Sequence, residues 1–182
     1  MLHLFLATGF EEIEAITTLD ILRRLNIEVK TVTVTGTRLI HGAHGVPCMA
    51  DCLFRKNIID ESEGLILPGG MPGAENLYLH EGLRKELIQH NSRGTLIAAI
   101  CAAPMILGRN GLLEGRKATC YPGFEKYLKG AEYTRELVTN DGNIITGLGP
   151  AAAVPFALAI AERFVERTKI DTLLYDMCFK AR

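Results

Sequence analysis

The chain has 182 residues, of which 48% are hydrophobic and 23% charged, and its formal net charge at pH 7 is −1. These values are ordinary for a soluble globular protein and predict a single domain over residues 1–182 with one sizeable core. The near-zero charge and the lack of Trp give no basic surface for nucleic acid or an anionic membrane.

The predicted elements begin almost at residue 1, with a strand over 3–8. Its apolar run is too short for a signal peptide or a membrane span, so we expect a cytoplasmic protein. An amphipathic helix follows over 12–24, then a β-branched strand over 28–34. Two short strands, over 37–40 and 46–51, flank a glycine-rich turn.

The rest of the chain continues to alternate between strand and helix. It comprises predicted strands over 64–67, 95–100 and 117–119, a hairpin pairing 138–139 with 144–146, and helices over 77–91, 151–166 and 169–177. This alternation predicts an α/β fold with a mostly parallel central sheet and helices on both faces. In such a sheet, ligands bind beyond the carboxyl ends of the strands. We therefore expect the loops at 8–11, 68–73 and 100–102 to converge on one site.

Cys101 stands at a sharp turn between the apolar strand and the sequence Ala102-Ala103-Pro104, which opens a helix. This strand–nucleophile elbow–helix arrangement is typical of an exposed, reactive nucleophile. The amino end of a helix favours a thiolate, so the pattern predicts a lowered thiol pKa. The alternative is a buried structural cysteine.

Two other segments hold candidate partners for this thiol. The backbone amides of Gly69 and Gly70 are candidate donors to an oxyanion, although a tight turn before a helix explains the glycines equally well. Glu14 lies in the first turn of a helix, where a carboxylate usually complements the helix dipole. A protonated Glu14 would instead donate to the sulfur, which requires a raised pKa and a coupled titration with Cys101.

No histidine neighbours the thiol, because Ala102 follows it. His41, His44, Cys48 and Cys52 lie close together in the sequence but lack regular zinc-ligand spacing, so we expect no metal and no cofactor. An odd total of five cysteines also argues against a disulfide framework.

The order of these motifs resembles the ThiJ/PfpI superfamily, and most closely its DJ-one-like branch. The matching segments are 9–14, 67–77, 97–104 and Gly149-Pro150 with 156–160. The resemblance implies a flavodoxin-like sandwich that usually forms a homodimer. It also implies that Cys101 is an oxidisable nucleophile, that a protonated Glu14 hydrogen-bonds it, and that Gly69 and Gly70 donate their amides to the site.

The chain departs from relatives at three places. Ala102 stands where the peptidase-like branch has histidine, and Tyr121 stands where some close relatives have histidine. Others carry a Ser-Arg pair where Gly147-Leu148 stands. Whether Tyr121, or His44 from a partner subunit, reaches the site is left open.

The resemblance implies several functions. We expect a Cys101 thiolate that acts on small 2-oxoaldehydes or their adducts, as a glyoxalase or deglycase linked to oxidative or carbonyl stress. The alternatives are a non-enzymatic redox sensor or chaperone, an intracellular peptidase or amidase, and the inherited label of thiazole monophosphate biosynthesis. The fold does not choose among them. The expected partners are an aldehyde substrate and a second copy of the chain, with neither nucleic acid nor membrane.

Overall fold

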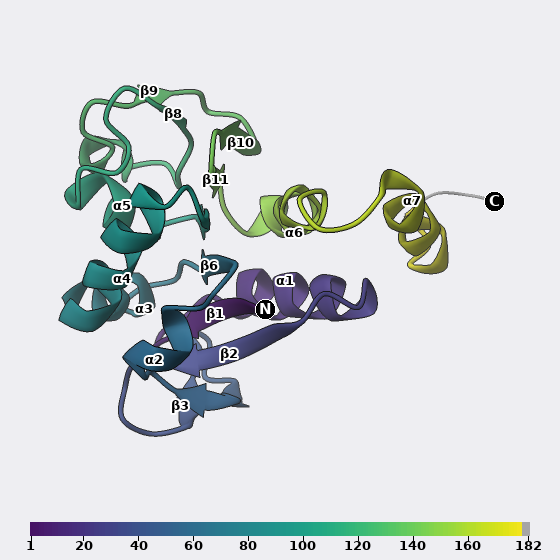
Figure 1. The fold of residues 1–182 in the computed structure, drawn as a ribbon, viewed down its shortest axis with the longest axis horizontal. Helices are drawn as coiled ribbons and strands as arrows, with labels where there is room; N and C mark the ends of the chain where they lie inside the picture. The colour runs from purple at the N-terminus through teal and green to yellow at the C-terminus, as the bar shows by residue number, and fades with distance from the viewer. Residues whose placement is uncertain (180–182) are drawn as a thin grey trace.

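A computed structural model describes residues 1–179, which are organised around one seven-stranded sheet (Figure 1). In the order β10-β11-β7-β6-β1-β2-β5, the strands are Val138–Asp141, Ile144–Gly147, Leu96–Ile100, Gly64–Leu67, Leu2–Leu6, Val29–Thr33 and Cys52–Leu53. Only the β10–β11 pair is antiparallel within this sheet. The order β2-β1-β6-β7-β11 is flavodoxin-like, which confirms the predicted fold class.

Helices cover both faces of the sheet (Figure 1). α1 (Glu12–Arg24) and α6 (Ala153–Ala161) pack together on one face. α3 (Gly73–Leu79), α4 (Glu81–Ser92) and α5 (Pro104–Arg109) lie on the other, as the left side of Figure 1 shows. Because both faces are covered, β1, β6 and β7 are buried along their whole length.

Several short elements lie outside these layers. They are the antiparallel hairpin of β3 (Leu39–His41) and β4 (Pro47–Met49), the parallel pair of β8 (Lys117–Ala118) and β9 (Glu132–Tyr133), α2 (Lys56–Ile59), and the 3₁₀ turns η1 (Glu125–Tyr127) and η2 (Pro150–Ala152). α7 (Arg167–Asp176) projects away from the body (Figure 1). No helix within residues 1–179 has the length and apolarity needed to cross a membrane.

The predicted elements differ from the structure in specific places. The helix predicted over 77–91 is two helices, since the chain is extended at His80, whose Nδ1 accepts from the Leu83 N–H at 3.0 Å and caps α4. The helix predicted over 151–166 ends at Ala161. β5, α2 and β9 were not predicted, because two to four residues carry too little periodicity. The last three residues of the predicted domain lie outside the described part of the chain.

Candidate active site

The loops that follow β1, β6 and β7 meet at one edge of the sheet, as predicted. β6 pairs with both β1 and β7, so the carboxyl ends of the three strands are adjacent. The Glu11 N–H donates to the Gly69 carbonyl at 2.9 Å, and the Gly73 N–H donates to the Gly9 carbonyl at 3.1 Å. These backbone bonds join the first two loops into one rigid wall beside Cys101.

Cys101 itself occupies a strained backbone conformation. Its φ is 64°, in the left-handed region that non-glycine residues rarely adopt. Its N–H donates to the Gly147 carbonyl at 2.9 Å, and its carbonyl accepts from the Tyr121 N–H at 2.8 Å. The side chain is only 8% exposed. The predicted elbow is therefore present, and its cysteine is nearly buried.

Glu14 lies beside the thiol and is completely buried. Its Oε2 accepts from the Gly69 N–H at 2.8 Å, while its Oε1 makes no hydrogen bond of ordinary geometry to residues 1–179. A Cβ placed on Gly69 would lie 2.6 Å from the Cys101 Cβ and 2.9 Å from the Glu14 Oε2. Only glycine at position 69 therefore lets the carboxyl group approach the thiol.

Burial controls the protonation of both groups. It raises the pKa of Glu14 to about 7, against the lowering effect of the Gly69 N–H and the Cys101 thiol. Burial also raises the pKa of Cys101, and a negative Glu14 raises it further, whereas the amides of Gly70 and Ala102 at the sulfur lower it. The raised pKa of Glu14 is what a protonated carboxyl group beside the thiol requires.

The predicted lowering of the Cys101 pKa is wrong. The helix α5 has only six residues and begins at Pro104, which has no N–H to offer the sulfur. Desolvation of a nearly buried sulfur outweighs the field of so short a helix.

The expected role of Gly69 also needs correction. Its N–H is occupied by the Glu14 carboxyl, so it is not free to stabilise an oxyanion. The amides that face the sulfur belong to Gly70 and Ala102. Ala102 thus contributes its backbone, at the position where a histidine side chain would stand in a peptidase-like relative.

The chemistry of the site follows from one shared proton. Once the pair has lost one proton, the remaining proton can lie on the sulfur or on the carboxyl group. In the form with Glu14 protonated, the charge is on sulfur and the carboxylate charge that raises the Cys101 pKa is gone. Such a pair offers a nucleophile and an adjacent carboxylic acid in a nearly water-free setting. It suits addition to a carbonyl group or reaction with a peroxide.

His44 and Tyr121, the two residues left open, differ in what they contact. His44 is exposed, and its Nδ1 lies 2.9 Å from Oε2 of Glu12 in the same chain. The hydrogen bond to Glu12, and after it the charges of Glu11 and Glu12, raise the His44 pKa. Tyr121 contacts Cys101 through its backbone N–H, and 46% of its surface is exposed.

Metal-type ligands are grouped differently from the sequence cluster of His41, His44, Cys48 and Cys52. Within residues 1–179, the structure gathers three such ligands only at Glu11, Glu12 and His44. The carboxyl of Glu12 already accepts from the backbone N–H of His44 at 2.8 Å and pairs with its ring. The two cysteines of the sequence cluster lie outside this group.

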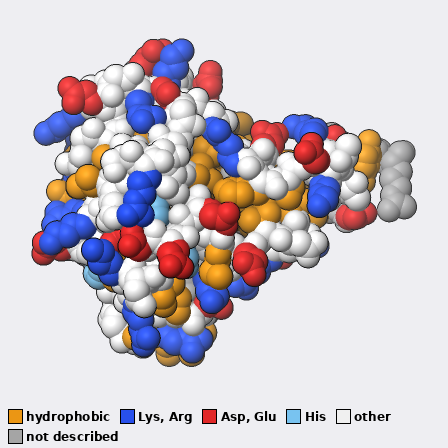
Figure 2. All heavy atoms as spheres, in the orientation of Figure 1, with side chains coloured by type: hydrophobic (Ala, Val, Ile, Leu, Met, Phe, Trp, Pro, Cys, Tyr) orange, Lys and Arg blue, Asp and Glu red, His pale blue; other side chains and the backbone are white. Residues whose placement is uncertain are grey.

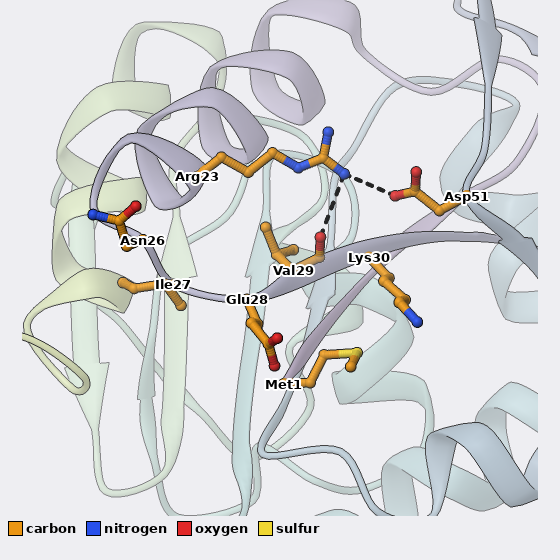
Figure 3. Close-up of a pocket in the computed structure, with 8 residues that line it drawn as sticks. All are labelled: Met1, Arg23, Asn26, Ile27, Glu28, Val29, Lys30 and Asp51. Atoms are coloured by element: carbon orange, nitrogen blue, oxygen red, sulfur yellow. Dashed lines mark hydrogen bonds and ion pairs between the residues drawn. The ribbon is translucent and has the colours of Figure 1, made fainter.

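Another hollow lies at the amino ends of β1 and β2, and neither Cys101 nor Glu14 lines it (Figure 3). It has a volume of about 490 Å³, and its charged side chains are those of Arg23, Glu28, Lys30 and Asp51. Figure 3 shows the Arg23 guanidinium directed at Asp51, to which it donates at 2.8 Å. Arg23 and Asp51 pair with each other there, and no Cys, Ser or His is among the described residues that line the cavity, so Cys101 remains the candidate site.

Two structural supports of the site were not predicted. The Asn76 side chain donates to the Thr8 carbonyl at 2.9 Å and joins the loop after β1 to α3. Arg109 on α5 donates to Glu75 on α3 at 2.8 Å. Asn76 lies within the segment 67–77, one of those on which the family resemblance rests, so the sequence offered a signal for it. The Arg109–Glu75 pair offered none, because its two charges lie 34 residues apart in the chain.

Comparison with known proteins gives one consistent result. The sequence model described as the DJ-1/PfpI family matches residues 2–163. The chain is 36% identical over 169 residues to Protein dj-1beta of Drosophila melanogaster, covering 91% of this chain and 90% of that protein. It is 36% identical over 148 residues to a deglycase of Pyrococcus horikoshii, covering 80% and 87%. Against Protein DJ-1 homolog B of Arabidopsis thaliana the identity is 39%, over 90% of this chain but only 38% of that longer protein.

Solved structures agree with the sequence matches. A DJ-1 superfamily protein from Salmonella typhimurium superposes with a TM-score of 0.92 at 32% identity, covering 99% of this chain and 98% of that one. A structure described as oxidized DJ-1 of Toxoplasma gondii gives a TM-score of 0.91 at 34% identity, covering 97% of both chains.

Proposed function

This chain belongs to the DJ-1/PfpI family, and we propose that it is an enzyme whose Cys101 attacks small 2-oxoaldehydes or the adducts they form. The observation that carries the proposal is the contact between a strained, nearly buried thiol and the fully buried Glu14, whose pKa is raised to about 7. The similarity to a deglycase supports the same class of substrate.

In the first step, the Cys101 thiolate adds to the aldehyde carbon. A carbon–sulfur bond forms, the π electrons of the carbonyl move to its oxygen, and Glu14 gives that oxygen its proton. The Gly70 and Ala102 amides, which face the sulfur, are the donors placed to stabilise the developing negative charge. The product is a hemithioacetal.

In the second step, the Glu14 carboxylate acts as a base. It removes the hydrogen of the former aldehyde carbon as a proton, the electron pair shifts toward the neighbouring carbonyl, and the oxygen of that carbonyl takes up a proton to give an enediol. Glu14 then returns a proton to the second carbon while the hydroxyl of the first carbon loses its proton, which leaves a thioester on Cys101. Water hydrolyses this ester to a 2-hydroxy acid and frees the thiol. The first carbon is oxidised and the second reduced, so the net reaction adds one water and needs no external oxidant.

Lactate formation from methylglyoxal tests this proposal. We expect wild type and a Cys52→Ser control to produce lactate, and Cys101→Ser and Glu14→Gln to lose nearly all activity. Cys52 is a suitable control because it is partly buried on a different strand, β5. Equal activity in wild type and Cys101→Ser would refute the proposal.

A second function, redox sensing, rests on the same sulfur. Attack of the thiolate on a peroxide forms a sulfenic acid and releases water, and a second peroxide converts it to a sulfinic acid. The Gly70 and Ala102 amides would then donate to the new oxygens. Mass spectrometry after mild peroxide treatment should find Cys101 oxidised before the other four cysteines; earlier oxidation of Cys48 would argue against sensing.

We also propose a homodimer. Ile13 and Ile16, one helical turn apart on α1, are 56% and 44% exposed, and the nearby hairpin exposes Met49 to 59%. Figure 2 shows further hydrophobic side chains gathered at the base of the arm formed by α6 and α7. Light scattering should give twice the chain mass for wild type and a lower mass for Ile16→Asp; a monomeric wild type would contradict the proposal.

A further inference from the structure

A small apolar hollow is lined by residues of the two segments that hydrogen-bond or adjoin the backbone of Cys101. It has a volume of about 240 Å³, and its walls include Tyr121, Leu137, Leu148 and Pro150. None of the described residues that line it carries a charge.

The hollow is joined to the backbone of the nucleophile on two sides. On one side, the Tyr121 N–H donates to the Cys101 carbonyl at 2.8 Å. On the other, the Cys101 N–H donates to the carbonyl of Gly147, and Leu148 follows directly in the chain. The Leu148 N–H donates in turn to the Leu137 carbonyl at 2.9 Å. These bonds hold both walls at a fixed position relative to the reacting sulfur.

The side chains of the hollow expose apolar surface that a ligand can cover. Leu137 is 52% exposed and Tyr121 46% exposed. A Cβ at position 149 would lie 3.1 Å from the Tyr121 ring. Glycine at this position therefore allows the ring to pack against the backbone and line the hollow. Burying an apolar group against such surface is favourable, whereas a polar group would lose its hydration there without gaining a partner.

We propose that this hollow binds the apolar substituent of the compound that reacts at Cys101. The site would then favour carbonyl compounds that carry an alkyl or aryl group over unsubstituted glyoxal. The identity of the reacting carbonyl rests on the proposed function, but the preference for an apolar substituent holds for any electrophile that reaches the sulfur.

Alkylation of Cys101 tests the hollow without requiring turnover. The rates of modification by iodoacetamide and by N-phenyl iodoacetamide are measured by mass spectrometry of the Cys101 peptide, each divided by the rate with free cysteine. We expect wild type to favour the phenyl reagent roughly tenfold, the scale of discrimination by one apolar group in a pocket. The preference should fall toward one in Leu137→Asn and Leu148→Asn and persist in a Leu79→Asn control, whose leucine is 65% exposed elsewhere.

The outcomes separate this inference from the proposed function. Absence of lactate formation together with a retained phenyl preference would refute the enzyme and support the hollow. A ratio near one in wild type, or an equal ratio in all variants, would overturn the inference, including the case in which a second copy of the chain covers the hollow.

Discussion

Replacing the buried Glu14 by glutamine should stabilise the protein while removing its reactivity. The pKa of Glu14 is raised from 4.5 to about 7 by burial, so the folded protein keeps a proton that the unfolded chain releases. Each pKa unit corresponds to 1.36 kcal/mol, so ionising this group in the folded state costs about 3 kcal/mol.

The sign follows from the raised pKa. As pH rises from 4.5 to about 7, the unfolded chain binds fewer protons at this position than the folded protein does, and the free energy of unfolding falls. Glutamine carries no charge, and its side-chain carbonyl can still accept from the Gly69 N–H. We expect Glu14→Gln to match wild type at about pH 4.5 and to exceed it by about 3 kcal/mol at about pH 8.

Urea unfolding of both proteins across this pH range measures the difference. The informative quantity is the free energy of unfolding of the variant minus that of wild type. Other groups, such as His3, titrate in the same pH range in both proteins, so their contributions cancel in this difference. A variant less stable than wild type at high pH, or a difference that does not change with pH, would refute the reasoning.

Other predictions concern the backbone and a second buried group. Gly70→Ala should lose at least about 2 kcal/mol of stability and slow the modification of Cys101, because φ is +84° and a Cβ would lie 2.6 Å from the Gly9 carbonyl oxygen. Gly36→Ala is the control, because Gly36 has a φ of +78° but no atom near the added Cβ, and it should lose about 1 kcal/mol of stability in the same urea assay. Equal losses of stability in Gly70→Ala and Gly36→Ala would contradict the steric argument. Burial lowers the pKa of His3 from 6.5 to about 4, so stability should fall as pH drops through that window. His3→Gln should flatten that loss in acid unfolding, and an unchanged slope would exclude His3 as its source.

Much of the fold was predictable because parallel strands buried on both faces form short continuous apolar runs. β6 and β7 have this pattern, and α1 begins with acidic residues and buries Ile21 and Leu22. The convergence of the three loops followed from strand alternation alone, since carboxyl ends of neighbouring parallel strands share an edge.

The protonation of the site was only partly predictable. A raised Glu14 pKa followed from placing a carboxyl beside a thiol, but the extent of burial around Cys101 depends on tertiary packing and reversed the expected direction for sulfur. The hydrogen-bond partners of the two glycine amides could not be predicted either. Sequence spacing does not show that the Gly69 N–H donates to Glu14 while the Gly70 N–H faces the sulfur. The hollow beside Tyr121 combines segments that are separate in the sequence, so no local motif marks it.

The pH dependence of Cys101 alkylation tests the shared proton most directly. In wild type, the rate should rise with a midpoint near the Glu14 pKa of about 7, because the pair gives up its first proton there. In Glu14→Gln the midpoint should move above the ordinary thiol pKa of about 8.5, since the sulfur stays buried and has lost its proton acceptor. A wild-type midpoint at or above the ordinary thiol value, unchanged in the variant, would show that Cys101 and Glu14 do not share a proton.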